Sequence, residues 1–233
     1  MIEERSTLAE RLAHVQAGIS DACRAADRSA DETTLIVITK FHPASLVAEL
    51  SALGVRDVGE NRHQEAQAKA AELADLDLTW HFVGQLQTKK ARQAAQYAGA
   101  IHSIDRERLV DALDVPADEP PPARLIDAFL QINLTDDPAR GGARPDEIEA
   151  LAERVLRSRS LRLRGVMAVA PLEEEPASAF ARLAGYSDRV RALDPAASFI
   201  SAGMTHDYAE AIAAGATHLR IGTAITGNRP VAG

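Results

Sequence analysis

The sequence has few of the features that mark secreted, membrane-spanning or nucleic-acid-binding proteins. Its one cysteine, Cys23, excludes an intrachain disulfide, and no apolar run reaches the roughly 18 residues of a spanning helix. Acidic residues number 34 against 26 lysines and arginines, which gives a net charge of -8. Duplex DNA and anionic membranes both require clustered positive charge. We therefore expect a cytoplasmic protein that has neither a nucleic acid nor a membrane as its partner.

The sequence also lacks the usual signs of a metal site or a catalytic thiol. Its 7 histidines form no His-x-His or His-x3-His pair and are scattered over helical and strand-like segments. Cys23 lies in a helical pattern with no cationic pocket indicated around it. We therefore expect no resident metal and no cysteine nucleophile.

Short apolar segments recur along the chain and have the length of strands. Most do not alternate apolar with polar residues, which is typical of parallel strands buried on both faces. These segments are Leu35–Thr39, Asp57–Asn61, Trp80–Gly84, Ala100–Asp105, Phe129–Leu134, Leu163–Val169, Phe199–Met204 and His218–Thr223.

Between these segments the apolar residues recur at helical spacing, as in Pro43–Gly54, Asp146–Arg157 and Ala209–Ala214. This alternation predicts an α/β fold, a (β/α)8 TIM barrel. An open doubly wound sheet is the rival, but it usually has a glycine-rich turn after its first strand, where this chain has Lys40 to Pro43.

Two further features belong to the same barrel. A helix over about residues 3–26 is expected before the first strand. The proline-rich stretch 115–122 is predicted to be a surface loop, because strands and helices resume directly after it. We therefore predict a single domain over residues 1–233.

Lys40 directly follows the apolar segment LIVIT, at the end of the barrel where active sites lie. A lysine at a strand end can simply extend into solvent. An amine at the mouth of an apolar barrel can also form an imine with an aldehyde.

Small and hydroxyl residues follow the seventh and eighth predicted strands, where barrels often bind phosphate. Arg220 lies inside the eighth apolar segment and needs a buried partner, which could be an interior carboxylate or a ring nitrogen of a cofactor. An imine-forming lysine, a phosphate site and an arginine at a ring nitrogen together indicate pyridoxal 5′-phosphate. The residues after the seventh and eighth strands are Ser201, Gly203, Met204, Thr205, Gly222 and Thr223.

In these residues and in the stretches that surround them, the sequence resembles the pyridoxal phosphate homeostasis proteins, single-domain relatives of the alanine racemase N-terminal barrel. The resemblance runs from about Leu35 to Gly227. The stretches that carry it are Ile38–Lys40, Gly54–Asn61, Trp80–Gln87, His102–Asp105, Leu163–Ala168, Ser201–Met204 and Arg220–Ile225.

The resemblance implies a Schiff base between the cofactor and Lys40, with Arg220 facing the pyridine nitrogen. Asn61 and Met167 would line the ring, and the residues after the seventh and eighth strands, Gly203 and Met204 included, would surround the phosphate. It also implies a role in buffering and delivering the cofactor, in amino-acid and keto-acid balance, with apo-enzymes as partners. Phe41, His42 and His206 depart from the residues usual in the family.

Robust catalysis is not expected. Arginine stays protonated, so Arg220 cannot give the pyridine nitrogen a proton, and an unprotonated ring accepts electrons poorly. Racemisation also needs acid–base groups on both faces of the substrate carbon, and the racemases take the second from an additional domain that we do not expect here. A weakly active racemase or lyase and an aldolase-like barrel remain the alternatives. A lone barrel is expected to be a monomer.

Overall fold

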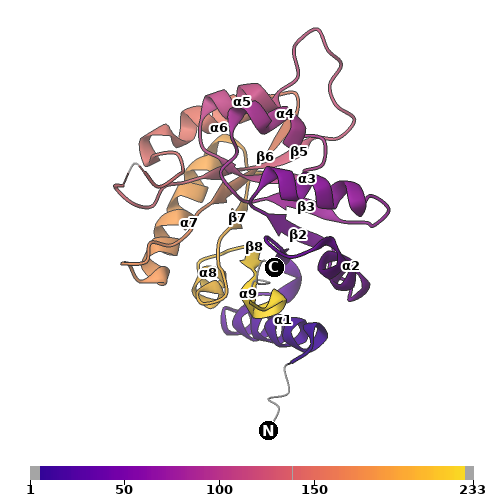
Figure 1. Ribbon diagram of the computed structural model, residues 1–233. Helices are drawn as coiled ribbons and strands as arrows, with labels where there is room; N and C mark the ends of the chain where they lie inside the picture. Colours follow the sequence, from indigo (N-terminus) through magenta and orange to yellow (C-terminus); the bar gives the residue numbers. More distant parts are fainter. Residues whose placement is uncertain (1–5, 138, 229–233) are drawn as a thin grey trace.

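The computed structural model describes residues 6–137 and 139–228, and strands and helices alternate throughout these ranges (Figure 1). The strands are β1 (Thr34–Ile38), β2 (Asp57–Glu60), β3 (Thr79–Phe82), β4 (Ala100–Ile104), β5 (Ile126–Gln131), β6 (Leu161–Met167), β7 (Phe199–Ser201) and β8 (His218–Ile221). The α-helices are α1 (Leu8–Ala25), α2 (Ala44–Ala52), α3 (His63–Glu72), α4 (Ala91–Ala94), α5 (Glu107–Leu113), α6 (Ile148–Leu156), α7 (Pro176–Leu193), α8 (Tyr208–Ala213) and α9 (Thr223–Thr226).

The strands form a closed parallel barrel in sequence order. Each pairs with the next, and β8 closes the barrel by pairing with β1, with Thr34 opposite His218 and Val37 opposite Ile221. Because all strands run the same way, their carboxyl ends meet at one end of the barrel. The predicted (β/α)8 barrel is confirmed.

The predicted boundaries differ most at the fifth strand, which was expected over Phe129–Leu134 but lies at Ile126–Gln131. Ile132 and Leu134 are buried outside the barrel, where Ile132 bridges to Ala143 in the following loop. The apolar run therefore continues beyond the strand, because the loop that follows is itself packed against the core. At the seventh strand the opposite holds, and Ala202 to Met204 already belong to the turn.

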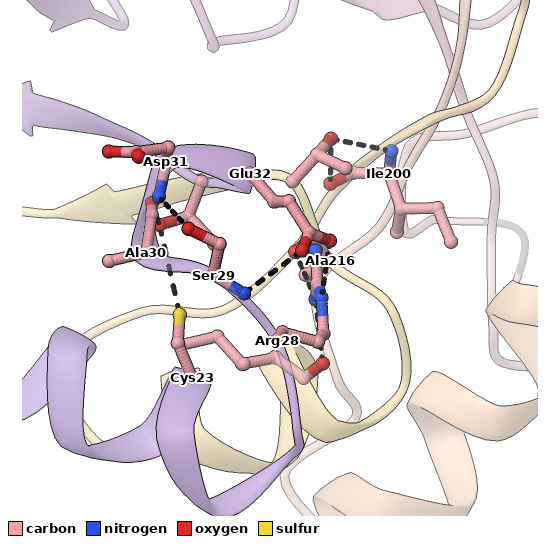
Figure 2. Close-up of polar contacts among 11 residues, drawn as sticks. Cys23, Arg28, Ser29, Ala30, Asp31, Glu32, Ile200 and Ala216 are labelled. Atoms are coloured by element: carbon pink, nitrogen blue, oxygen red, sulfur yellow. Dashed lines mark hydrogen bonds and ion pairs between the residues drawn. The ribbon is translucent and has the colours of Figure 1, made fainter.

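The N-terminal helix α1 packs against α8 and α9 (Figure 1). It begins with a capping box on Thr7 and Glu10, and the predicted residues 3–5 lie outside the described range. After the helix, Arg28 Nη1 donates a hydrogen bond of 2.8 Å to the carbonyl oxygen of Ile212. It donates another of 2.8 Å to that of Ala216 (Figure 2). The segment that leads into β1 is thereby fixed to the turn that leads into β8, which stabilises the closure of the barrel.

The predicted loop 115–122 lies between α5 and β5, contains no helix or strand, and extends away from the barrel (Figure 1). Across the described ranges, no helix has both the length and the apolar character that a membrane span requires.

Gly165 in β6 is required by the close approach of β7. Its φ of +146° lies in the region that glycine favours, and a Cβ there would lie 1.9 Å from the carbonyl oxygen of Phe199. We expect Gly165→Ala to lower the free energy of unfolding by about 2–4 kcal/mol, because backbone atoms must move. Urea unfolding measures the change. Gly185→Ala, in α7 with open space around the added carbon, is the control and should gain roughly 0.5–1 kcal/mol; equal effects of the two substitutions would contradict this account.

Candidate functional site

Lys40 lies at the mouth of the barrel, two residues beyond the end of β1. Its side chain is half-buried, and within the described part of the chain no hydrogen bond or ion pair engages its amine. The next residue, Phe41, has a positive φ of 69° and its N–H donates to Glu65 Oε2 at 3.3 Å. The backbone is thus turned sharply around a lysine whose amine is available for reaction.

A buried ion pair supports the backbone beside Lys40. Lys69 Nζ lies 2.6 Å from Glu60 Oε1 and donates to the carbonyl oxygen of Thr39 at 2.9 Å, while the Thr39 hydroxyl donates to Glu60 Oε1 at 2.7 Å. Burial raises the pKa of Glu60, and the hydrogen bonds from Lys69 and Thr39 counteract part of that rise. Sequence reasoning missed this pair, although Lys69 shares one helix face with the buried His63 and Ala66, a position where an unpaired charge would be costly.

The predicted phosphate site lies where β7 and β8 end. Gly203 has a φ of +92°, and its carbonyl oxygen accepts the N–H of Arg220 at 2.9 Å, which joins the two strand ends. A Cβ on Gly222 would lie 3.3 Å from the Cβ of Ile38, so glycine lets this turn sit close to β1. Thr223 is exposed at the start of α9, and among the described residues its N–H and that of Ala224 have no acceptor. These groups are free to bind an anion.

The other predicted site residues surround the same end of the barrel. Met167 ends β6, is 2% exposed, and pairs in register with Ser201. Asn61 follows β2, and its side-chain oxygen is buried with no hydrogen-bond partner among the described residues. Met204 and Thr205 follow Gly203 and are accessible at the rim. The predicted residues therefore come from the carboxyl ends of β6, β7, β8, β1 and β2, which are neighbours in the barrel.

Arg220 is 5% exposed and points into the barrel. Its Nη1 donates to Ser201 Oγ at 2.7 Å and its Nη2 donates to the carbonyl oxygen of Ala168 at 2.9 Å. Burial lowers its pKa to about 10, so it stays protonated at neutral pH. The Ser201 hydroxyl is fully buried against Arg220 and His102, so its expected contact with a phosphate stays a prediction.

Histidines from three strands meet below this site. His81 Nδ1 lies 2.9 Å from His102 Nε2, and the rings of both lie near that of His218. Burial is the main cause that lowers the pKa of His102 well below its usual value and that of His218 to about 3. Sequence reasoning missed this cluster, because the three histidines are distant along the chain and follow no metal-binding spacing.

Comparison with known proteins places the chain. The family model "Alanine racemase, N-terminal domain" matches residues 13–230. The Pyridoxal phosphate homeostasis protein of Pseudomonas aeruginosa is 40% identical over 226 residues, which cover 96% of each chain. That of Escherichia coli is 38% identical over 234 residues, 95% of this chain and 97% of the relative. The chain belongs to the pyridoxal phosphate homeostasis protein family.

Solved structures agree with this assignment to the pyridoxal phosphate homeostasis proteins. PipY of Synechococcus elongatus, solved without PLP, superposes with a TM-score of 0.80 at 35% identity and covers 95% of this chain and 100% of its own. PipY with PLP bound gives a TM-score of 0.77 at 33% identity with the same coverage. Alanine racemase from Corynebacterium glutamicum, at 15% identity and a TM-score of 0.67, shares the fold and covers 97% of this chain and 62% of its own.

Proposed function

We propose that this protein binds pyridoxal 5′-phosphate covalently at Lys40 and acts in the homeostasis of that cofactor. The observation that carries the proposal is the amine of Lys40, which has no hydrogen bond or ion pair among the described residues and follows β1, the strand next to the Gly222–Thr223 turn. In this condensation the neutral lysine amine bonds through its nitrogen to the aldehyde carbon, and the aldehyde oxygen leaves as water together with the two amine hydrogens. The structure of PipY, which is 33% identical to this chain and was solved with PLP bound, supports the assignment of the ligand.

The residues around Lys40 fit such a ligand. The open amides of Thr223 and Ala224, the Thr223 hydroxyl and the turn that follows Ser201, through Gly203 and Met204 to Thr205, would hold the phosphate. The buried side-chain oxygen of Asn61 has no hydrogen-bond partner within residues 6–137 and 139–228, and Asn61 would line the ring together with Met167. Arg220 would face the ring nitrogen.

These residues favour storage of the cofactor over rapid turnover. The bound cofactor supplies an aldehyde and an electron-accepting ring, and such a ring accepts electrons best when its nitrogen is protonated. Arg220 stays protonated at neutral pH, so it neither transfers a proton to the ring nitrogen nor accepts a hydrogen bond from a protonated one. We propose a monomer that delivers the cofactor to apo-enzymes. An assay of alanine and serine racemisation by the loaded protein distinguishes this role from that of a racemase, which would show multiple turnovers.

Thr223→Val is expected to weaken the binding of pyridoxal phosphate about 10-fold or more, since a hydrogen bond to a charged group contributes roughly 1.5–3 kcal/mol. The binding of pyridoxal, which has no phosphate, should not change. Titration of both ligands into apo-protein measures the two effects. Thr79→Val, an exposed threonine at the opposite end of the barrel, is the control. An equal loss of affinity for both ligands would show that Thr223 does not contact the phosphate.

A further inference from the structure

A chain of hydrogen bonds crosses the barrel interior from Arg220 to a carboxylate at the opposite end. Ser201 Oγ lies 2.8 Å from His102 Nδ1, His102 Nε2 lies 2.9 Å from His81 Nδ1, and His81 Nε2 lies 2.9 Å from Asp57 Oδ1. The chain begins at β8 and β7 and passes through β4 and β3 to the first residue of β2. His81, His102, Ser201 and Arg220 are buried, whereas the Asp57 side chain is 29% exposed.

The donor at one end, Arg220, and the acceptor at the other, Asp57, determine which atom donates in each hydrogen bond of this chain. Arg220 is protonated and donates to Ser201 Oγ, so the Ser201 hydroxyl hydrogen needs another acceptor, and His102 Nδ1 is the partner at hydrogen-bond distance. His102 must then carry its hydrogen on Nε2 and donate to His81 Nδ1. His81 carries its hydrogen on Nε2 and donates to the Asp57 carboxylate. Every donor then meets an acceptor, with both histidines neutral.

The surroundings favour this neutral arrangement. His102 is fully buried, stacks on Phe129 with ring centroids 4.3 Å apart, and faces the nearby His218 and Arg220. Arg164 on β6 adds positive charge beside His218. Burial, with Arg220 nearby, disfavours a proton on His102, and Asp57 is the carboxylate at the far end of the hydrogen-bond chain.

We propose that Asp57, His81 and His102 are positioning residues. Through their hydrogen bonds they orient the Ser201 hydroxyl so that its oxygen accepts from Arg220, which in turn places the Arg220 guanidinium near the cofactor ring nitrogen. The proposal rests on the proposed function for its ligand, but the hydrogen bonds join the protein's own residues and can be tested without that ligand. The half-exposed Asp57 carboxylate at one end of the barrel thus orients the hydrogen bonds that end at Arg220.

The histidine tautomers of the apo-protein test the chain directly. Long-range 15N–1H correlation of 15N-histidine-labelled protein at neutral pH should show both His81 and His102 with hydrogen on Nε2. Hydrogen on Nδ1 of either ring would overturn the proposal, whether or not the protein binds pyridoxal phosphate.

Asp57→Leu tests the coupling to Arg220. It removes the terminal acceptor, so the Nε2–H tautomers should become mixed and pyridoxal phosphate should bind two- to tenfold more weakly, the effect of about one hydrogen bond. The 15N resonance of pyridoxal phosphate labelled at its ring nitrogen should move. Asp57→Asn keeps a carbonyl acceptor for His81, so the histidine tautomers, the affinity for pyridoxal phosphate and the ring-nitrogen resonance should all return to their wild-type values.

The control is Asp111→Asn, which alters an exposed carboxylate on α5 that pairs with Arg154 and takes no part in these hydrogen bonds. If Asp57→Leu does not fold, His81→Phe breaks the same link. Unchanged tautomers and an unchanged ring-nitrogen resonance in a folded variant would overturn the coupling. Absence of any covalent label on Lys40 in the wild type would instead refute the proposed function, and the apo-protein tautomers would still decide the chain.

Discussion

We expect Lys40→Ala to abolish the covalent attachment of pyridoxal phosphate, because it removes the amine that forms the bond. The side chain is half-buried at the barrel mouth with no partner among the described residues, whereas Lys69 is engaged by Glu60. The visible absorption of the protein–cofactor mixture should lose the band that borohydride bleaches. The phosphate contacts remain, so weak non-covalent retention should persist. Gel filtration followed by absorbance measures both.

Lys90→Ala is the matched control for this variant. Lys90 also follows a strand at the same end of the barrel, after β3, but its amine donates to Gln93 and lies in a short helical turn. Its removal should leave the bleachable band unchanged. A Lys40→Ala protein that still forms the full band would contradict the assignment.

Lys69→Met is expected to destabilise the protein by about 3–5 kcal/mol, because it leaves the Glu60 carboxylate buried and unpaired. Glu60 is 1% exposed, and one of its oxygens already has no hydrogen-bond partner among the described residues. The carbonyl oxygen of Thr39 also loses the Lys69 donor and keeps only the N–H of His42. Urea unfolding of the apo-protein measures the loss of stability.

The pH dependence of this loss has a definite sign. Burial already raises the folded-state pKa of Glu60, and removal of Lys69 should raise it further. A carboxyl with a raised folded-state pKa favours the folded protein when it is protonated, and this contribution is lost as the pH rises through that pKa. The cost of Lys69→Met should therefore be smallest in acid and grow toward neutral pH. The double variant Glu60→Gln/Lys69→Met removes both charges and should recover part of the stability; a cost that grows toward acid pH would contradict the account.

The sequence was sufficient for the barrel because each strand carries its own apolar pattern and each helix its own period. It also located Lys40, Gly222 and Thr223, since a residue that directly follows a strand lies at a known end of the barrel. It could not give the partners of buried side chains. Which interior residues meet depends on how far the strands are staggered when the barrel closes, and local spacing does not record that stagger. Lys69 with Glu60, and His102 with Ser201, are contacts of this kind.

The same limit applies to Arg220. Its place in an apolar strand indicated a buried partner, but the alternatives were an interior carboxylate and a ring nitrogen. In the structure its guanidinium donates to a serine hydroxyl and to a backbone carbonyl, and Asp57 is reached from that serine through two histidines. Neither partner neutralises its charge directly.

The central claim is that Lys40 holds the cofactor, and mapping the reduced adduct tests it most directly. The purified protein is loaded with pyridoxal phosphate, reduced with borohydride and digested with trypsin. A modified Lys40 is not cleaved, so the account predicts that the label lies on a peptide of residues 29–56 in place of the separate peptides 29–40 and 41–56. Recovery of the label mainly on a peptide that contains Lys69 or Lys89, with residues 29–40 unmodified, would contradict it.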